Sequence, residues 1–187
     1  MQKRRVTWLS KTLSYLLRHG AYDENLKIDP GGWVKISDVL DFINSQAKKK
    51  VDIEDLKYLV GHNDKRRFTL RDDKIRANQG HSFPVDLGLK AKKPPDVLYH
   101  GTYQNVKEKI LKQGLKKMQR NHVHLSSDVE TAIKVGKRRG KPIIFQIEAK
   151  KMHEGGHTFL KSENDVWLVN YVPPNYLNLK NELKGKN

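Results

Sequence analysis

Apolar residues recur at helical spacing in three places within the first sixty residues of the chain. The first stretch ends at Gly20, which is suited to stop a helix, and its apolar face consists of Leu9, Leu13, Leu16 and Leu17. Ser37 and Asp52 can each cap a further helix. The residues expected to face inward from these two helices are Val39, Leu40, Ile43, Ile53, Leu56, Leu59 and Val60. The pattern therefore predicts three short helices.

A strand pattern follows the third predicted helix. Residues 68–70 and 74–76 flank the turn-like Arg71-Asp72-Asp73, which indicates a β-hairpin. Short helices followed by a two-stranded wing are typical of the winged helix, a common nucleic-acid-binding module. We therefore expect residues 1–85 to form a winged-helix lobe.

A polar stretch with several prolines separates this lobe from the rest of the chain. It runs from Ser82 to Asp96 and contains the sequence KAKKPP, whose paired prolines exclude a helix interior or a central strand. We expect residues 86–96 to form a linker and residues 97–187 to form a second lobe.

The second lobe mixes strands with helices. Strands are predicted at residues 97–100, 122–125, 142–147 and 166–169. Thr102 is expected to cap a helix that ends at Gly114, while Ser127 and Glu130 have the spacing of a capping box that opens another helix. The apolar residues of these two helices are Val106, Ile110, Leu111, Val129, Ala132 and Ile133. The predicted fold class is α+β.

Composition narrows the partner and the chemistry. The formal net charge is +16, which favours a polyanion as partner, with nucleic acid as the first candidate and an anionic membrane surface as the second. A lysine-rich solvated surface is a third explanation. Cysteine is absent, which excludes disulfides, thiolate nucleophiles and Cys-type zinc sites. We expect a cytoplasmic protein without a membrane span or signal peptide, because the apolar stretches are short.

Familiar nucleotide-binding motifs are missing, and the candidate functional residues are arginines and histidines. The sequence has no GxGxxG after a strand and no GxxxxGK[ST]. Arg18 and His19 end the first predicted helix, where cations also complement the helix dipole. Two arginines from separate elements would suit a phosphomonoester, because each guanidinium can pair with two of its oxygens.

Two further segments carry candidate site residues. His100-Gly101-Thr102 is predicted to lie at a strand-to-helix turn, where backbone N–H groups and a helix N-terminus can receive an anion. In Arg120-Asn121-His122-Val123-His124-Leu125-Ser126, the two histidines point the same way from a strand. A metal site at His122 and His124 is the alternative interpretation, although no carboxylate lies at ligand spacing.

Seven short sequences, in this order, closely resemble the tRNA 2′-phosphotransferases: LSKTLSYLLRHG, KRRF, KIRANQGHS, LYHGT, RNHVHLS, VGKRRGKP and NDVWL. The resemblance covers nearly the whole chain, from about Leu9 to Leu177. It implies an N-terminal winged-helix RNA-binding lobe joined to a C-terminal ADP-ribosyltransferase-like lobe that binds NAD⁺.

The resemblance also implies roles for individual residues. The essential set of the family falls on Arg18, His19, Arg67 and Arg120. The NAD⁺-binding positions fall on His100 and His124, with Gly101, Thr102 and Ser126 completing the pocket and Arg138 and Arg139 placed for cofactor phosphates. Arg66 is the alternative to Arg67, while Arg138 or Arg139 is the alternative to Arg120.

The implied reaction removes an internal 2′-phosphate from RNA, as at a tRNA splice junction. NAD⁺ is the co-substrate, and the products are 2′-OH RNA, nicotinamide and ADP-ribose 1″,2″-cyclic phosphate. No metal is required, because arginines neutralise the phosphate. Many ADP-ribosyltransferases have a glutamate where Val166 stands here, and a carboxylate there would repel a phosphate nucleophile. We expect a monomer. A purely nucleic-acid-binding protein and an enzyme that ADP-ribosylates other acceptors remain the alternatives.

Overall fold

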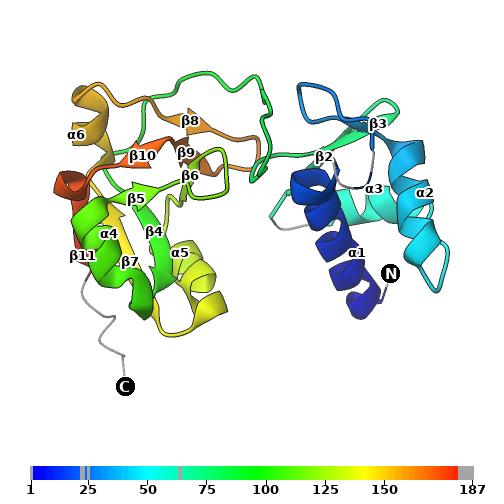
Figure 1. The fold of residues 1–187 in the computed structure, drawn as a ribbon, viewed down its shortest axis with the longest axis horizontal. Coiled ribbons are helices and arrows are strands. Elements are labelled where there is room, and N and C mark those ends of the chain that lie inside the picture. Colours follow the sequence, from blue (N-terminus) through cyan, green and yellow to red (C-terminus); the bar gives the residue numbers. More distant parts are fainter. Residues whose placement is uncertain (1, 22–23, 25, 63–64, 181–187) are drawn as a thin grey trace. The chain divides into compact units, whose positions relative to one another are not determined.

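The computed structural model describes residues 2–21, 24, 26–62 and 65–180. The chain divides into two units, Met1–Gly88 and Leu89–Asn187, each with its own hydrophobic core. Helices and small antiparallel sheets occur together, as Figure 1 shows, which confirms the predicted mixture of helices and strands. The two units are described separately below.

The first unit begins with an apolar-faced helix, as predicted. Its helical elements are α1 (Lys3–Tyr15), the π-helical turn η1 (Leu16–Gly20), α2 (Ile36–Gln46) and α3 (Ile53–Gly61). The four leucines of the predicted apolar face are fully buried in the core. The widening of the last turn into a π-helix was not predicted, because apolar spacing does not distinguish it from an α-helical turn.

One of the two predicted helix caps in this unit is wrong. Asp52 caps α3 as predicted, with its carboxylate accepting a hydrogen bond of 2.9 Å from Asp55 N. Ser37 does not cap α2, which begins one residue earlier, and its hydroxyl donates to Asp38 instead. The N–H of Ile36 donates a hydrogen bond to the Asp73 carbonyl of the hairpin turn. A tertiary contact therefore satisfies an N–H group at the start of α2 that has no partner within the helix.

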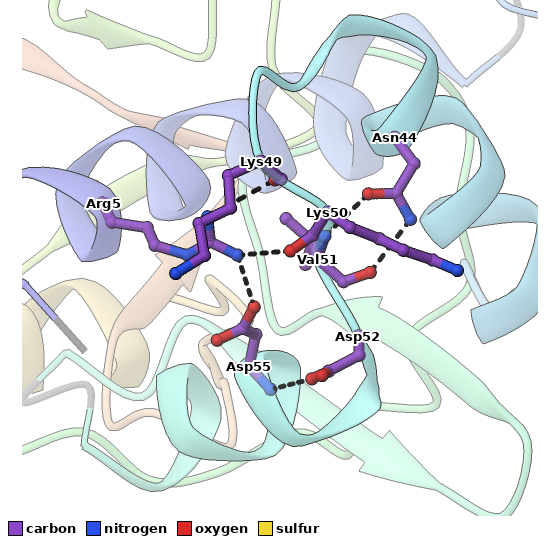
Figure 2. Close-up of polar contacts among 7 residues, drawn as sticks. All are labelled: Arg5, Asn44, Lys49, Lys50, Val51, Asp52 and Asp55. Carbon is purple, nitrogen blue, oxygen red and sulfur yellow. Dashed lines mark hydrogen bonds and ion pairs between the residues drawn. The ribbon is translucent and has the colours of Figure 1, made fainter.

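A cluster of polar contacts joins α1 to the loop before α3 (Figure 2). The Arg5 guanidinium donates to the Lys50 carbonyl at 2.7 Å and to the Asp55 carboxylate at 2.6 Å. Asn44 of α2 bonds both the N–H and the carbonyl of Val51. These contacts fix the start of α3 relative to α1 and α2, which holds the three helices of the unit in one arrangement.

The predicted hairpin is confirmed and gains a third strand. It consists of β2 (Phe68–Arg71) and β3 (Lys74–Ala77), with Arg71 paired to Lys74 across a two-residue turn. The short strand β1 (Val34–Lys35) pairs with the other edge of β3, giving the order β1-β3-β2. Strand β3 is therefore central, and its residues from Ile75 to Ala77 are buried.

The second unit contains three small antiparallel sheets with helices packed against them. Its strands are β4 (Leu98–Tyr103), β5 (Leu115–Lys116), β6 (Val123–Leu125), β7 (Pro142–Ile147), β8 (Leu160–Lys161), β9 (Trp167–Val169), β10 (Tyr171–Val172) and β11 (Leu177–Lys180). They form the sheets β11-β7-β4, β6-β9-β8 and β10-β5. Its helices are η2 (Gln104–Val106), α4 (Lys107–Gln113), α5 (Val129–Gly136), η3 (Lys137–Arg139), α6 (Ala149–Glu154) and η4 (Pro174–Tyr176).

The predicted turn at His100-Gly101-Thr102 is wrong. These residues lie inside β4, which pairs with β7 along its whole length, including Thr102 with Ile143. Thr102 therefore does not cap a helix, and α4 begins only at Lys107. Gly101 fits a strand because α5 crosses it closely: a Cβ at this position would lie 1.7 Å from the Ala132 carbonyl oxygen.

The capping box predicted at Ser127 is also wrong. Asp128 caps α5, and its carboxylate accepts a 2.7 Å hydrogen bond from Thr131 N. The Ser127 hydroxyl instead accepts a hydrogen bond from the Trp167 indole N–H at 3.2 Å. This contact links the start of α5 to β9, so the serine that precedes the helix serves tertiary packing.

Candidate functional site

The π-helical turn η1 carries the first pair of predicted site residues. Arg18 and His19 lie in Leu16–Gly20, where the wider winding follows directly on α1. Single π-helical turns are rare and occur frequently at functional sites. Leu16 and Leu17 are fully buried, which anchors the turn in the core, while His19 is exposed and Arg18 is half-buried. The turn thus presents both polar side chains from a fixed backbone.

Residues 80–82 pack on this turn. Gly80 has φ +94°, and its Cα faces the Arg18 side chain so closely that an added Cβ would lie 3.5 Å from Arg18 Nε. Ser82 N donates to the Arg18 carbonyl at 2.9 Å, and Ser82 Oγ lies 3.0 Å from His19 Nδ1. The segment after the hairpin therefore bonds the backbone of Arg18 and the ring of His19, and it packs against the Arg18 side chain.

A buried neutral histidine lies beneath these cations. His81 is 1% exposed, and its pKa is lowered from 6.5 to about 4, mainly by burial and in addition by the nearby charges of Arg18, Arg76 and His19. Its Nε2 has no hydrogen-bond partner among the described residues. Arg76 is itself buried, donates to the Gly31 carbonyl, and places its guanidinium 4.5 Å from the Trp33 ring centroid. Positive charge thus gathers around a histidine that stays uncharged at neutral pH.

We expect His81 to make stability depend on pH. Because the pKa of His81 is lowered in the folded state, this residue binds a proton below pH 6.5 in the unfolded chain. In the folded protein it binds that proton only below about pH 4. The free energy of unfolding should therefore be fully supported above pH 6.5 and fall by on the order of 3 kcal/mol on acidification to pH 4. Urea unfolding of wild type and His81→Gln over this range measures the difference. Equal pH slopes for the two proteins would contradict the expectation.

Arg66 and Arg67 enter the hairpin from a backbone that Asn78 holds. Asn78 N donates to the Arg67 carbonyl at 2.9 Å, and Asn78 Nδ2 donates to the Arg66 carbonyl at 2.7 Å. The Thr69 hydroxyl bonds the Asn78 side-chain oxygen at 2.7 Å. Arg66 has a positive φ of 37°. Arg67 is half-buried and Arg66 is exposed.

In the second unit, His100 and His124 lie together. His100 Nδ1 lies 3.0 Å from the His124 carbonyl oxygen, so Nδ1 carries the proton and Nε2 carries the lone pair. Burial lowers the pKa of His100, and Arg120 lowers it further, while the bond to the carbonyl opposes them. His100 is therefore neutral and able to accept a hydrogen bond at neutral pH.

Arg120 and Ser126 lie in the same region as His100 and His124. Gly101 and Thr102 instead pack against α5. Ser126 pairs with Tyr99 through two backbone hydrogen bonds, which joins the end of β6 to β4. Gly101 faces α5 and not an open space, so its role in this structure is close packing. The Thr102 carbonyl lies against Gly136 of α5, where an added Cβ would be 2.6 Å away.

Two of the predicted residues lie in η3 at the end of α5. Arg138 is exposed. The side chain of Arg139 lies outside the described residues. Arg120 lies close enough to His100 to lower the pKa of that ring.

The structure also bears on metal and membrane binding. Within residues 2–21, 24, 26–62 and 65–180, no group of three or more His, Asp or Glu side chains is arranged to hold a metal ion. The same residues contain no helix that is both long and apolar enough to cross a bilayer.

The sequence alone assigned no role to three residues that lie among the candidate arginines and histidines. Asn78, which bonds Arg66 and Arg67, His81, and Ser82, which bonds Arg18 and His19, all fall in the sequence KIRANQGHS directly after the hairpin. Asn78 and His81 are buried polar side chains, and such residues are uncommon unless they bond to or pack on something specific. The sequence feature that could have identified these residues is a run of polar residues directly after a strand, without the alternation of apolar residues that a further strand would show.

Comparison with known proteins gives consistent results. A family model described as RNA 2′-phosphotransferase, Tpt1 / KptA family, matches residues 3–171. The chain is 47% identical over 183 residues to a probable RNA 2′-phosphotransferase of Trichormus variabilis, covering 97% of this chain and 100% of that protein. It is 46% identical over 174 residues to one of Flavobacterium johnsoniae, covering 92% and 95%. It is 49% identical over 172 residues to one of Hahella chejuensis, covering 91% and 92%.

Proposed function

The chain belongs to the RNA 2′-phosphotransferase family Tpt1 / KptA, and from this membership we propose that it removes an internal 2′-phosphate from RNA by transfer to NAD⁺. The family predicted from the seven short sequences is thereby confirmed. The observation that carries the proposal is the cationic cluster of Arg18, His19 and Arg76 on the π-helical turn and around neutral His81. Such a cluster suits a phosphate dianion.

In this proposal Arg18, His19 and Arg67 bind the 2′-phosphate of the RNA, and Arg120 supplies positive charge beside His100. Each arginine supplies a planar fork that can donate two parallel hydrogen bonds to phosphate oxygens. A phosphate is already anionic at neutral pH, so the site needs no base to generate the nucleophile. The apolar Val166, directly before β9, is consistent with that requirement, because a carboxylate there would repel the phosphate.

The region around His100 and His124 is the proposed site for NAD⁺. Neutral His100 has its Nδ1 proton engaged with the His124 carbonyl, which leaves its Nε2 as an acceptor for a hydroxyl or amide group of the nucleotide. Arg120, close enough to His100 to lower the pKa of that ring, supplies positive charge beside the same histidine. An uncharged acceptor next to a cation fits a ligand that carries both ribose hydroxyls and phosphates.

NAD⁺ is a substrate of the proposed reaction: it supplies a ribosyl carbon with nicotinamide as the leaving group, and a neighbouring 2″-hydroxyl. The RNA phosphate displaces nicotinamide from that carbon. The 2″-hydroxyl then attacks phosphorus and releases its proton to solvent water, while the RNA 2′-oxygen leaves. His19 donates the proton that this oxygen needs. The arginines stabilise the charge on the phosphoryl oxygens as the bonds change, so the products are 2′-OH RNA and ADP-ribose 1″,2″-cyclic phosphate.

The two units have different proposed tasks. The helices, hairpin and third strand of Met1–Gly88 have the content of a winged helix, and we assign RNA binding to it. The small antiparallel sheets of Leu89–Asn187 form the proposed ADP-ribosyltransferase-like lobe. The net charge of +16 supports RNA as the polyanionic partner, with tRNA as the proposed substrate.

A direct assay tests the proposed function. The full-length protein is incubated with an oligoribonucleotide that bears one internal 2′-phosphate, with and without NAD⁺, and the products are separated and weighed by mass spectrometry. We expect 2′-OH RNA, one nicotinamide for each phosphate removed, and no reaction without NAD⁺. Release of inorganic phosphate without NAD⁺ would contradict the proposal and indicate a hydrolase.

A further inference from the structure

The strongest unassigned contact in the first unit is that of Ser82. Its hydroxyl oxygen lies 3.0 Å from His19 Nδ1 and 3.2 Å from the Arg18 carbonyl oxygen. The same carbonyl accepts a hydrogen bond from Ser82 N at 2.9 Å. One serine therefore contacts both members of the Arg18-His19 pair, one through the backbone and the other through the ring.

A single hydroxyl proton can serve only one of the two Ser82 side-chain contacts, and the geometry decides which. If the proton pointed at His19 Nδ1, two acceptor oxygens, Ser82 Oγ and the Arg18 carbonyl, would face each other at 3.2 Å with no proton between them. That arrangement is repulsive. If the proton points at the carbonyl, Ser82 Oγ keeps a lone pair for the ring, and both contacts are satisfied. The ring must then donate from Nδ1.

This direction of donation defines the state of the His19 ring. A proton fixed on Nδ1 means that the proton exchanged with substrate is on Nε2, because the partner of one ring nitrogen sets the state of the other. The arrangement is compatible with both the neutral and the protonated ring. The Arg18 carbonyl, which accepts the hydrogen bond from the Ser82 hydroxyl, lies in the π-helical turn. It is near the end of a helix, where carbonyl groups need hydrogen-bond partners from outside the helix.

We propose that Ser82 is a positioning residue that holds the His19 ring with Nδ1 as a donor, so that Nε2 faces the RNA phosphate. The inference deepens the proposed function and rests on it for the identity of the substrate. Gly80 supports the same arrangement, because its positive φ of 94° brings the segment onto Arg18, where only a residue without a side chain adopts this backbone freely.

Activity measurements on three variants form the first arm of the test. Ser82→Ala removes the acceptor, and we expect the single-turnover rate of 2′-phosphate removal to fall about 10-fold to 100-fold, as commonly follows loss of a residue that orients a functional histidine. Ser82→Thr keeps the hydroxyl and should recover most of the rate. Ser37→Ala is the matched control, since the Ser37 hydroxyl is exposed and bonds only Asp38 in the described part of the chain; its rate should equal that of wild type.

The second arm does not depend on activity. Two-bond ¹H–¹⁵N correlation spectra of the full-length protein, with the His19 signals assigned by comparison with His19→Gln, distinguish a proton on Nδ1 from one on Nε2. We expect the Nδ1-protonated form in wild type and in Ser82→Thr, and a mixture of the two neutral forms in Ser82→Ala. An Nε2-protonated ring in the wild type would overturn the proposal, as would a Ser82→Ala rate equal to wild type or equal losses in Ser82→Ala and Ser82→Thr.

The two arms separate failure of this inference from failure of the proposed function. If the protein does not act on 2′-phosphorylated RNA but the spectra change as expected, the proposed substrate is wrong and the positioning role of Ser82 stands. If the protein is active but the spectra do not respond to Ser82→Ala, the substrate stands and the positioning role is overturned.

Discussion

Arg18→Ala is expected to lower the rate of 2′-phosphate removal roughly 100-fold or more while the protein remains folded, because loss of one charge-stabilising donor in a phosphoryl or acyl transfer site has effects of this size. The Arg18 backbone is held by Ser82 N, and the neighbouring Leu16 and Leu17 are fully buried, so the turn should persist without the guanidinium. Single-turnover kinetics at saturating NAD⁺, with circular dichroism as a check of folding, measure the loss.

Two companion variants sharpen this expectation. Arg18→Lys keeps the charge but loses the planar fork, so we expect it to regain only part of the rate. Arg4→Ala removes an exposed arginine from the same helix, α1, and should leave the single-turnover rate unchanged. An Arg18→Ala protein with nearly the wild-type rate would remove Arg18 from the phosphate site, whatever the family resemblance implies.

Gly101→Ala is expected to destabilise the second unit by about 3 kcal/mol or more, because the new methyl group would overlap the backbone of α5. The added Cβ would lie 1.7 Å from the Ala132 carbonyl oxygen and 2.5 Å from its carbonyl carbon. Backbone atoms cannot rotate away as a side chain can, so α5 must shift from β4. We expect the thermal midpoint of the second unit to fall by roughly 10 °C or more.

The control for Gly101→Ala is Gly61→Ala, where an added Cβ would meet no described atom within 4 Å beyond its own helix backbone and chain neighbours; the thermal midpoint of this variant should be unchanged or slightly raised. Adding Ala132→Gly to Gly101→Ala should not restore stability, because the overlap is with the Ala132 backbone. A Gly101→Ala protein that keeps its stability but no longer binds NAD⁺ would instead support the role in the cofactor pocket that the family resemblance implied.

The helices of the first unit were largely predictable from the sequence, and the reason is periodicity. The four leucines of α1 and η1 and the Asp52 cap of α3 are local features, each determined within its own stretch of helix. Ser37 is not the cap because α2 begins at Ile36, whose N–H bonds the hairpin turn, and Ser127 is not the cap because its hydroxyl bonds Trp167. A serine followed by a helical pattern does not reveal such tertiary partners.

The site was predictable in its residue types and less so in its local structure. Glycine between His100 and Thr102 was interpreted as a break, whereas the structure needs it for the crossing of α5 over a continuous strand. Nothing in the spacing of Arg18 and His19 predicts a π-helical turn. Ser82 lies 63 residues from His19 in the chain, so their contact depends on tertiary folding alone. The roles in catalysis and NAD⁺ binding assigned to all the candidate site residues stay predictions.

The π-helical turn has a consequence for attempts to engineer this protein. An α-helical turn would satisfy the backbone of Leu16–Gly20 with better geometry, so removing one residue there is a change that a search for stabilising mutations would favour. In an α-helix each residue advances by about 100°, so the deletion would rotate whatever follows it by about that angle. Arg18 and His19 would then face a different side of the helix. Selection for thermal stability alone would therefore favour a more stable protein in which Arg18 and His19 no longer face their present side.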